Sequence, residues 1–176
     1  DIAPVTLVST SPLVLVANTA LGLESVRDLI NLAKTKPLYY GTSGPGSGGH
    51  MSVELLKSIA GFNATHVAYK GSAAATNDVI AGHVQFEIVG PVTVLSLAKA
   101  GRLKVLAVTS AKRSASMPDV PTVDESGVPG FDVVNWFGIV APANTPAALV
   151  QRLNREIVAS LQLADVRQKL AGEGAE

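Results

Sequence analysis

The amino-acid sequence predicts an α/β fold built around a mostly parallel sheet. Short β-branched apolar runs alternate with stretches of helical periodicity, which is the pattern of consecutive βαβ units. Hydrophobic residues make up 47% of the chain and charged residues 16%, which is typical of a compact fold. A length of 176 residues fits one domain or slightly more.

Seven apolar segments are predicted strands. The second of them, residues 13–17, is almost uniformly apolar, as expected for a strand that is covered on both faces. The seven segments are residues 5–8, 13–17, 38–41, 65–69, 84–89, 103–109 and 133–140.

Predicted helices follow most of these strands. The first begins at Glu24 or Ser25 and ends before Pro37, and later ones are expected over residues 72–81, 91–100 and 147–161, with a short one from residue 164. The helix from about Ser47 to Gly61 has apolar residues at three- and four-residue spacing, which indicates an amphipathic helix. These residues are Met51, Leu55, Leu56 and Ile59.

Residues 111–131 are polar and are interrupted by three prolines and two glycines. Such punctuation is typical of a connecting segment. We expect at most one short helix here, near Val123, and a crossover between two domains.

The stretch GTSGPGSGGH, residues 41–50, joins a predicted strand to a predicted helix. Unpaired N–H groups and the positive dipole end of a helix N-terminus favour a carboxylate or phosphate there. Ser43 and Ser47 can add hydroxyl donors, and His50 either contacts the ligand or braces the loop. Glycines of this kind also occur simply to let a helix pack tightly on its sheet, so both interpretations stay open.

Two further loops are predicted to emerge at the same edge of a parallel sheet, since each follows a strand. The first contains Lys70, Gly71 and Ser72, and the second runs from Gly90 and Pro91 to Thr93. Three helix N-termini would then converge, with backbone N–H groups as the main donors. Lys70 is a candidate countercharge.

Other chemistries have weaker signals. Gly44, Gly46 and Gly49 satisfy the dinucleotide pattern G-x-G-x-x-G, but Tyr69-Lys70-Gly71 occupies the place where an acidic residue should hold the ribose. Neither Ser43 nor Ser47 completes the G-x-S-x-G of a hydrolase.

Composition excludes several classes of partner. Fourteen basic and fourteen acidic residues balance, so no broad footprint for nucleic acid or an anionic membrane exists. No apolar run approaches the roughly 20 residues of a membrane span, and no export signal is visible. The chain has no cysteine, and its three histidines are too far apart for a local metal site. We expect no cofactor, no metal and no catalytic residue.

Four segments together resemble a known family. They are YGTSGPGSGGH (residues 40–50), HVAYKG (66–71), AGRLKVLAVTSAKRSASMPDVPTVDESGVPGF (100–131) and WFGIVAPANTPAALVQRLNREI (136–157). In this order they are similar to the solute-binding proteins of tripartite tricarboxylate transporters, the Bug family, over essentially the whole chain.

The resemblance implies a periplasmic binding protein of two α/β lobes. Such a protein closes on a small mono- or dicarboxylate and delivers it to a membrane permease, without catalysis or cofactor. Residues 1–10 would cross over from an absent N-terminal lobe, 11–126 would form the second lobe, and 127–176 would return a strand and helices to the first. The sequence would then be a fragment or an incomplete chain, without its signal peptide.

The resemblance also implies which residues bind the ligand. Residues matching the family's carboxylate-binding loop are Ser43, Gly44, Ser47, Gly48, Gly49 and His50, and those matching its second cleft loop are Tyr69, Lys70 and Gly71. Gly90 and Pro91 belong to the third loop, where the family often has an Asp or Asn and this chain is apolar, so a ligand with an ammonium group is disfavoured.

Two alternatives remain open. One is the effector-binding domain of a transcription regulator, which shares the two-lobe architecture but is cytosolic. The other is a dinucleotide-binding enzyme built on the glycine loop.

Overall fold

The structure is a computed structural model that describes residues 1–172, 174 and 175. The chain divides into two compact units. Unit 1 is Asp1–Ser11 with Asn135–Glu176, and unit 2 is Pro12–Val134. Val128 and Phe131 are buried in the core of unit 2.

Unit 2 contains a five-stranded sheet with the order β4-β3-β5-β2-β6. The central part is parallel, since β3 pairs parallel with both β4 and β5. Strand β2 runs antiparallel to its neighbours β5 and β6, so a single strand departs from the common direction. The strands are β2 (Val14–Asn18), β3 (Tyr39–Thr42), β4 (Thr65–Ala68), β5 (Phe86–Val89) and β6 (Leu103–Val108).

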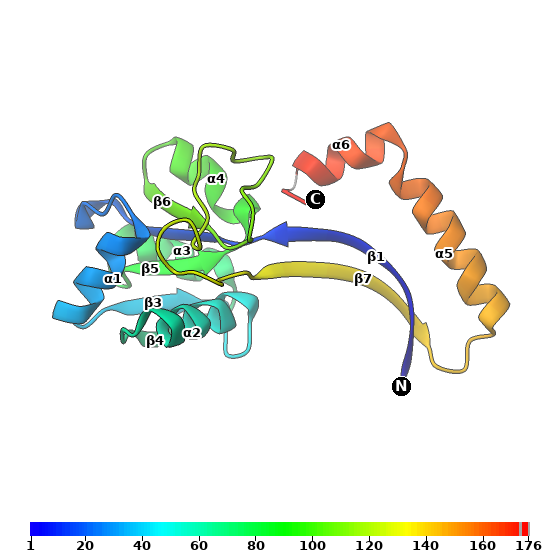
Figure 1. Cartoon of the computed structure of the whole chain (residues 1–176), viewed down its shortest axis with the longest axis horizontal. Helices are drawn as coiled ribbons and strands as arrows, with labels where there is room; N and C mark the ends of the chain where they lie inside the picture. The colour runs from blue at the N-terminus through cyan, green and yellow to red at the C-terminus, as the bar shows by residue number, and fades with distance from the viewer. Residues whose placement is uncertain (173, 176) are drawn as a thin grey trace. The chain divides into compact units, whose positions relative to one another are not determined.

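Helices cover both faces of this sheet (Figure 1). One core contains buried side chains of α1 and α2, and the other contains those of α3 and α4. A short 3-10 helix, η1 (Thr19–Leu21), follows β2. The helices are α1 (Val26–Thr35), α2 (Gly48–Ala60), α3 (Ser72–Ala81) and α4 (Pro91–Lys99).

The position of β2 in the sheet explains why its sequence is uniformly apolar. Leu15 and Ala17 belong to the core beneath α1 and α2, and Val14 and Val16 belong to the core beneath α3 and α4. Because successive side chains of a strand point to opposite faces, both faces of the strand are buried, as the sequence predicted.

The apolar spacing of α2 was misleading about its buried face. Met51, Leu55 and Ile59 are exposed, whereas Val53 and Leu56 are fully buried. Buried among these apolar side chains is also Ser52, whose hydroxyl donates to the carbonyl of Gly48 at 2.7 Å. The helix thus packs on the sheet through Ser52, Val53 and Leu56, a different face from the one that its apolar spacing predicted.

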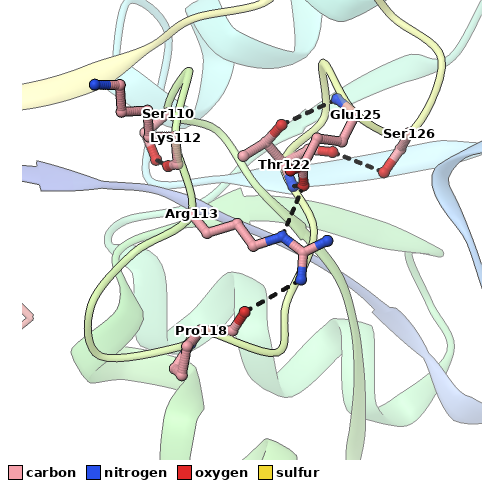
Figure 2. A network of polar contacts seen from close by, with 7 residues as sticks. All are labelled: Ser110, Lys112, Arg113, Pro118, Thr122, Glu125 and Ser126. Atoms are coloured by element: carbon pink, nitrogen blue, oxygen red, sulfur yellow. Dashed lines mark hydrogen bonds and ion pairs between the residues drawn. The ribbon is translucent and has the colours of Figure 1, made fainter.

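Residues 110–126 form an ordered loop (Figure 2) with no helix near Val123, which agrees with the expectation of at most one short helix there. Arg113 Nε donates to Glu125 Oε2 at 2.9 Å, and Arg113 Nη1 donates to the carbonyl of Pro118 at 3.2 Å. The backbone N–H of Thr122 also donates to Glu125 Oε2. These donors lower the pKa of Glu125, the Thr122 N–H first. Val123 is buried, so the loop is tied to unit 2 by polar and apolar contacts.

Unit 1 contains the two-stranded sheet of β1 (Ile2–Pro12) and β7 (Val134–Pro142), followed by α5 (Ala147–Leu161) and α6 (Ala164–Gly172). Asn154 of α5 donates from Nδ2 to the carbonyl of Val5 at 2.7 Å. Over the described part of the chain, no helix is long and apolar enough to cross a membrane.

Candidate functional site

Three strand-to-helix loops of unit 2 leave the sheet at the same edge, as the sequence predicted. Strand β3 lies between β4 and β5 and is parallel to both, so the carboxyl ends of all three strands meet there. Each loop leads into a helix, and the N-cap residues are Ser47 for α2, Gly71 for α3 and Gly90 for α4. Three positive helix ends therefore face this edge.

Two amides of the first loop are bound by side chains of the protein. The N–H of Gly44 donates to Thr42 Oγ1 at 3.1 Å, and the N–H of Gly46 donates to His50 Nδ1 at 3.1 Å. His50 therefore braces the loop, which was one of its two predicted roles. Gly44, which the sequence placed in the ligand loop, has its own amide committed to Thr42.

The first turn of α2 keeps unpaired donors. Ser47 Oγ accepts the N–H of His50 at 3.3 Å, and the Ser47 carbonyl accepts the N–H of Met51. Among the described residues, no acceptor is found for the N–H groups of Gly48 and Gly49. These two amides and the hydroxyl hydrogens of Ser47 and exposed Ser43 have no acceptor among the described residues.

Gly49 also serves the packing of α2 on the sheet. A β-carbon on Gly49 would lie 2.2 Å from the carbonyl oxygen of Ile88 in β5, a distance that no side chain tolerates. Gly49 thus lets the helix approach the strand, as the packing interpretation of the glycine stretch predicts, while its amide remains unpaired. The loop itself needs glycine at Gly44 (φ 134°) and Gly46 (φ 77°), where backbone angles lie in the region that other residues rarely adopt.

Beneath the loop lies a stack of three rings, which the sequence did not predict. The rings of His50 and His66 have centroids 4.2 Å apart, and those of His66 and Tyr40 are 5.1 Å apart. His66 Nε2 lies 2.6 Å from Thr42 Oγ1. Burial lowers the pKa of His66, and the neighbouring His50 lowers it further, so the neutral form of His66 is favoured.

Charged groups close the other side of this stack. The hydroxyl of Tyr40 donates to Glu54 Oε1 at 2.5 Å, and Lys57 Nζ donates to the same oxygen at 2.7 Å. Lys57 and then Tyr40 lower the pKa of Glu54, whereas burial raises the pKa of Tyr40. The spacing of Glu54 and Lys57 on one helix was the only sequence signal for this cluster.

The second loop uses part of its polar groups within unit 2. The hydroxyl of Tyr69 donates to Asp78 of α3 at 2.7 Å, and its N–H donates to the carbonyl of Thr42 at 2.9 Å. Burial and the Asp78 carboxylate raise the pKa of Tyr69 to about 12. Lys70 is exposed, and Gly71 has a φ of 117° and no side-chain cap.

The third loop offers fewer donors than the first. Pro91 is the first residue of α4 and carries no N–H. The N–H of Thr93 donates to the carbonyl of Gly90 at 3.2 Å. Gly90 has an ordinary φ of −61°, so its conformation does not require glycine.

A buried carboxyl lies in β5, close in sequence to this loop. Glu87 is 1% exposed, and Thr76 Oγ1 of α3 donates to its Oε1 at 2.6 Å. Burial raises the pKa of Glu87 to about 7, although the Thr76 bond opposes this shift. The signal for it was an acidic residue inside an otherwise apolar predicted strand.

Comparison with known proteins identifies the family. Residues 1–176 match the sequence profile of the family described as "Tripartite tricarboxylate transporter family receptor". The chain belongs to this family. Protein BugT of Bordetella pertussis is a relative of this receptor chain, with 36% identity over 177 residues, which are 99% of this chain and 54% of BugT.

Solved structures agree with the family assignment. An R. palustris protein determined with adipate is 39% identical to the receptor chain with a TM-score of 0.91, and the match covers 100% of this chain and 60% of that protein. MatC from Rhodopseudomonas palustris, determined with bound malate, is 28% identical with a TM-score of 0.84, and the match covers 99% of this chain and 60% of MatC. BugD, described as a periplasmic binding protein, is 30% identical with a TM-score of 0.84, and the match covers 99% of this chain and 59% of BugD.

The receptor chain spans about half the length of the curated relatives it matches. Its α/β fold is that of the periplasmic binding proteins named above, as the sequence predicted. The transcription-regulator and dinucleotide-enzyme alternatives find no support among these relatives.

Proposed function

We propose that this receptor chain belongs to a periplasmic solute-binding protein that captures a small organic mono- or dicarboxylate and delivers it to a permease of the tripartite tricarboxylate type. Capture is by non-covalent contacts alone, without a cofactor. The periplasmic location is supported by the description of BugD, a structural relative over 99% of this chain.

The observation that carries the proposal is the pair of unpaired amides at the start of α2. Gly48 and Gly49 donate to no described acceptor, and Ser47 adds a hydroxyl beside them. Backbone N–H groups at a helix N-terminus bind carboxylates through charge-assisted hydrogen bonds. The structures of relatives with adipate and with malate support this chemistry for the ligand.

Other residues around the same edge have supporting roles in this proposal. Ser43 is exposed and can donate its hydroxyl, and exposed Lys70 supplies a positive charge. Tyr69, Gly71, Gly90 and Pro91 form the neighbouring loops, where the starts of α3 and α4 add dipole charge and bridging water can complete the contacts.

Calorimetry tests the proposal on the full gene product. Malate, adipate and other organic acids would be titrated, with NAD as the competing class. We expect saturable binding of at least one carboxylate and no heat with NAD. Ser47→Ala should weaken that binding about fivefold or more, since it removes one hydrogen bond to a charged group.

The matched control is Ser58→Ala, which makes the same chemical change on an exposed position of the same helix. It should bind as the unaltered protein does. Binding of NAD with no binding of any carboxylate would falsify the proposal.

A further inference from the structure

Two side chains beneath the first loop hold it at two glycines. Thr42 Oγ1 accepts the N–H of Gly44, and His50 Nδ1 accepts the N–H of Gly46. Both glycines have positive φ. Because glycine has no side chain, it restricts the backbone less than any other residue does. These two acceptors therefore hold the amides of Gly44 and Gly46 in place.

His66 contacts both acceptors from the neighbouring strand β4. Its Nε2 lies 2.6 Å from Thr42 Oγ1, and its ring stacks on that of His50 with an angle of 26° between the planes. No other described side chain is within hydrogen-bonding distance of Thr42 Oγ1. One residue thus connects the two anchors of the loop.

The hydrogen bond from Gly46 fixes the tautomer of the His50 ring. His50 Nδ1 accepts from Gly46, so in the neutral ring the proton is on Nε2. The groups that face the pair are Tyr40 of β3 and the Glu54–Lys57 ion pair of α2. Since that ion pair is internally compensated, the stack holds no uncompensated charge when both imidazoles are neutral.

We propose that His66 is a positioning residue for the ligand loop, acting through Thr42 and the ring of His50 to fix Gly44 and Gly46. With those two amides committed, Gly48 and Gly49 are left as the donors for the carboxylate. The effect on binding rests on the proposed function, whereas the effect on the loop does not.

Amide hydrogen exchange in the ligand-free full gene product tests the loop directly. His66→Phe keeps an aromatic ring beside His50 and removes the contact with Thr42. We expect exchange at Gly44 to become about fivefold to tenfold faster, as for the loss of one hydrogen bond. Unchanged exchange at Gly44 and Gly46 in a folded His66→Phe protein would overturn the proposal.

A double-mutant cycle tests whether His66 acts through Thr42. Carboxylate affinity would be measured for His66→Phe, Thr42→Val and the double variant. We expect each single change to weaken binding about fivefold and the double variant to be no weaker than the worse single one. Independent, multiplying losses would show that His66 does not act through Thr42.

Two further variants separate positioning from a general loss of stability. Thr42→Ser keeps the hydroxyl that Thr42→Val removes. Its exchange rate at Gly44 and its carboxylate affinity should therefore equal those of the unaltered protein. His83→Asn alters an exposed histidine that precedes β5, at the opposite edge of the sheet, and should change neither. If the unaltered protein binds no carboxylate, the proposed function fails, while the exchange measurement still decides the role of His66.

Discussion

Gly49 and Ile88 are in backbone contact, and a β-carbon on Gly49 would lie 2.2 Å from the carbonyl oxygen of Ile88. This contact sets the start of α2 directly against β5. The residue that lets the helix approach the sheet is thus one of the two that keep a free amide at the loop.

Gly49→Ala is predicted to push the start of α2 away from β5. Because the clash is with backbone, we expect a loss of about 2 kcal/mol or more in the free energy of unfolding, measured by urea denaturation. Gly90→Ala is the control, since a β-carbon there meets nothing within 4 Å and φ is −61°. It should cost about 1 kcal/mol or less. Equal losses in the two variants would contradict this account.

Ser47 is predicted to stabilise α2 as its N-cap. Its Oγ accepts the N–H of His50, so Ser47→Ala should lower the free energy of unfolding by about 1 kcal/mol. Ser47→Gly should cost only a few tenths of a kcal/mol. Thermal and urea unfolding measure both. If alanine proved as stable as serine at this position, the cap would contribute nothing.

Glu87 is predicted to make stability depend on pH. Its folded pKa of about 7 lies above the ordinary value of 4.5, so the unfolded chain ionises first. The stabilisation is complete below pH 4.5 and is lost as the pH rises to about 7, a change of roughly 3 kcal/mol. Glu87→Gln, which can still accept from Thr76, should remove this dependence.

The measurement is the difference between the unfolding free energies of the two proteins at several pH values. A difference is needed because the lowered pKa of His66 acts oppositely, with stabilisation present above its ordinary value of 6.5 and lost at lower pH. Parallel curves for the unaltered protein and Glu87→Gln would show that Glu87 ionises normally in the folded state.

The two adjacent leucines of α2 should respond differently to truncation. Leu56 is fully buried and Leu55 is 39% exposed. Leu56→Ala should cost about 2–5 kcal/mol in the free energy of unfolding, whereas Leu55→Ala should cost about 1 kcal/mol or less. The pair is measured by urea denaturation. A larger loss at Leu55 would show that α2 packs on the sheet through the face that contains Leu55 and not through Leu56.

The succession of strands and helices along the chain was predictable because it depends on local sequence patterns. Residues 13–17 had to be a buried strand, and the loops after β3, β4 and β5 had to meet once those strands were parallel. The reversed direction of β2 was not predictable in this way, since strand direction follows from pairing between distant segments. The burial of Leu56 and the exposure of Leu55 depend on which face of α2 packs on the sheet, and the apolar spacing alone does not decide this.

The glycine loop was predicted from sequence, but which of its amides are bonded within the protein and which are unpaired was not. Committed and free amides differ only in what lies beneath them, and Thr42 and His66 come from two different strands. A pattern within ten residues cannot show that. Glu87 could have been noticed as an acidic residue in an apolar strand, yet its partner Thr76 lies on another element.

The placement of β2 between β5 and β6 bears on how unit 2 is made. Residues 14–18 pair with residues 86–89 and 103–108. This early segment can form its strand pairings only after the two later segments have been synthesised. Contacts so distant in sequence close slowly. A nascent chain that ends before residue 103 cannot complete this sheet, and assembly is therefore expected to follow synthesis of the whole unit instead of keeping pace with it.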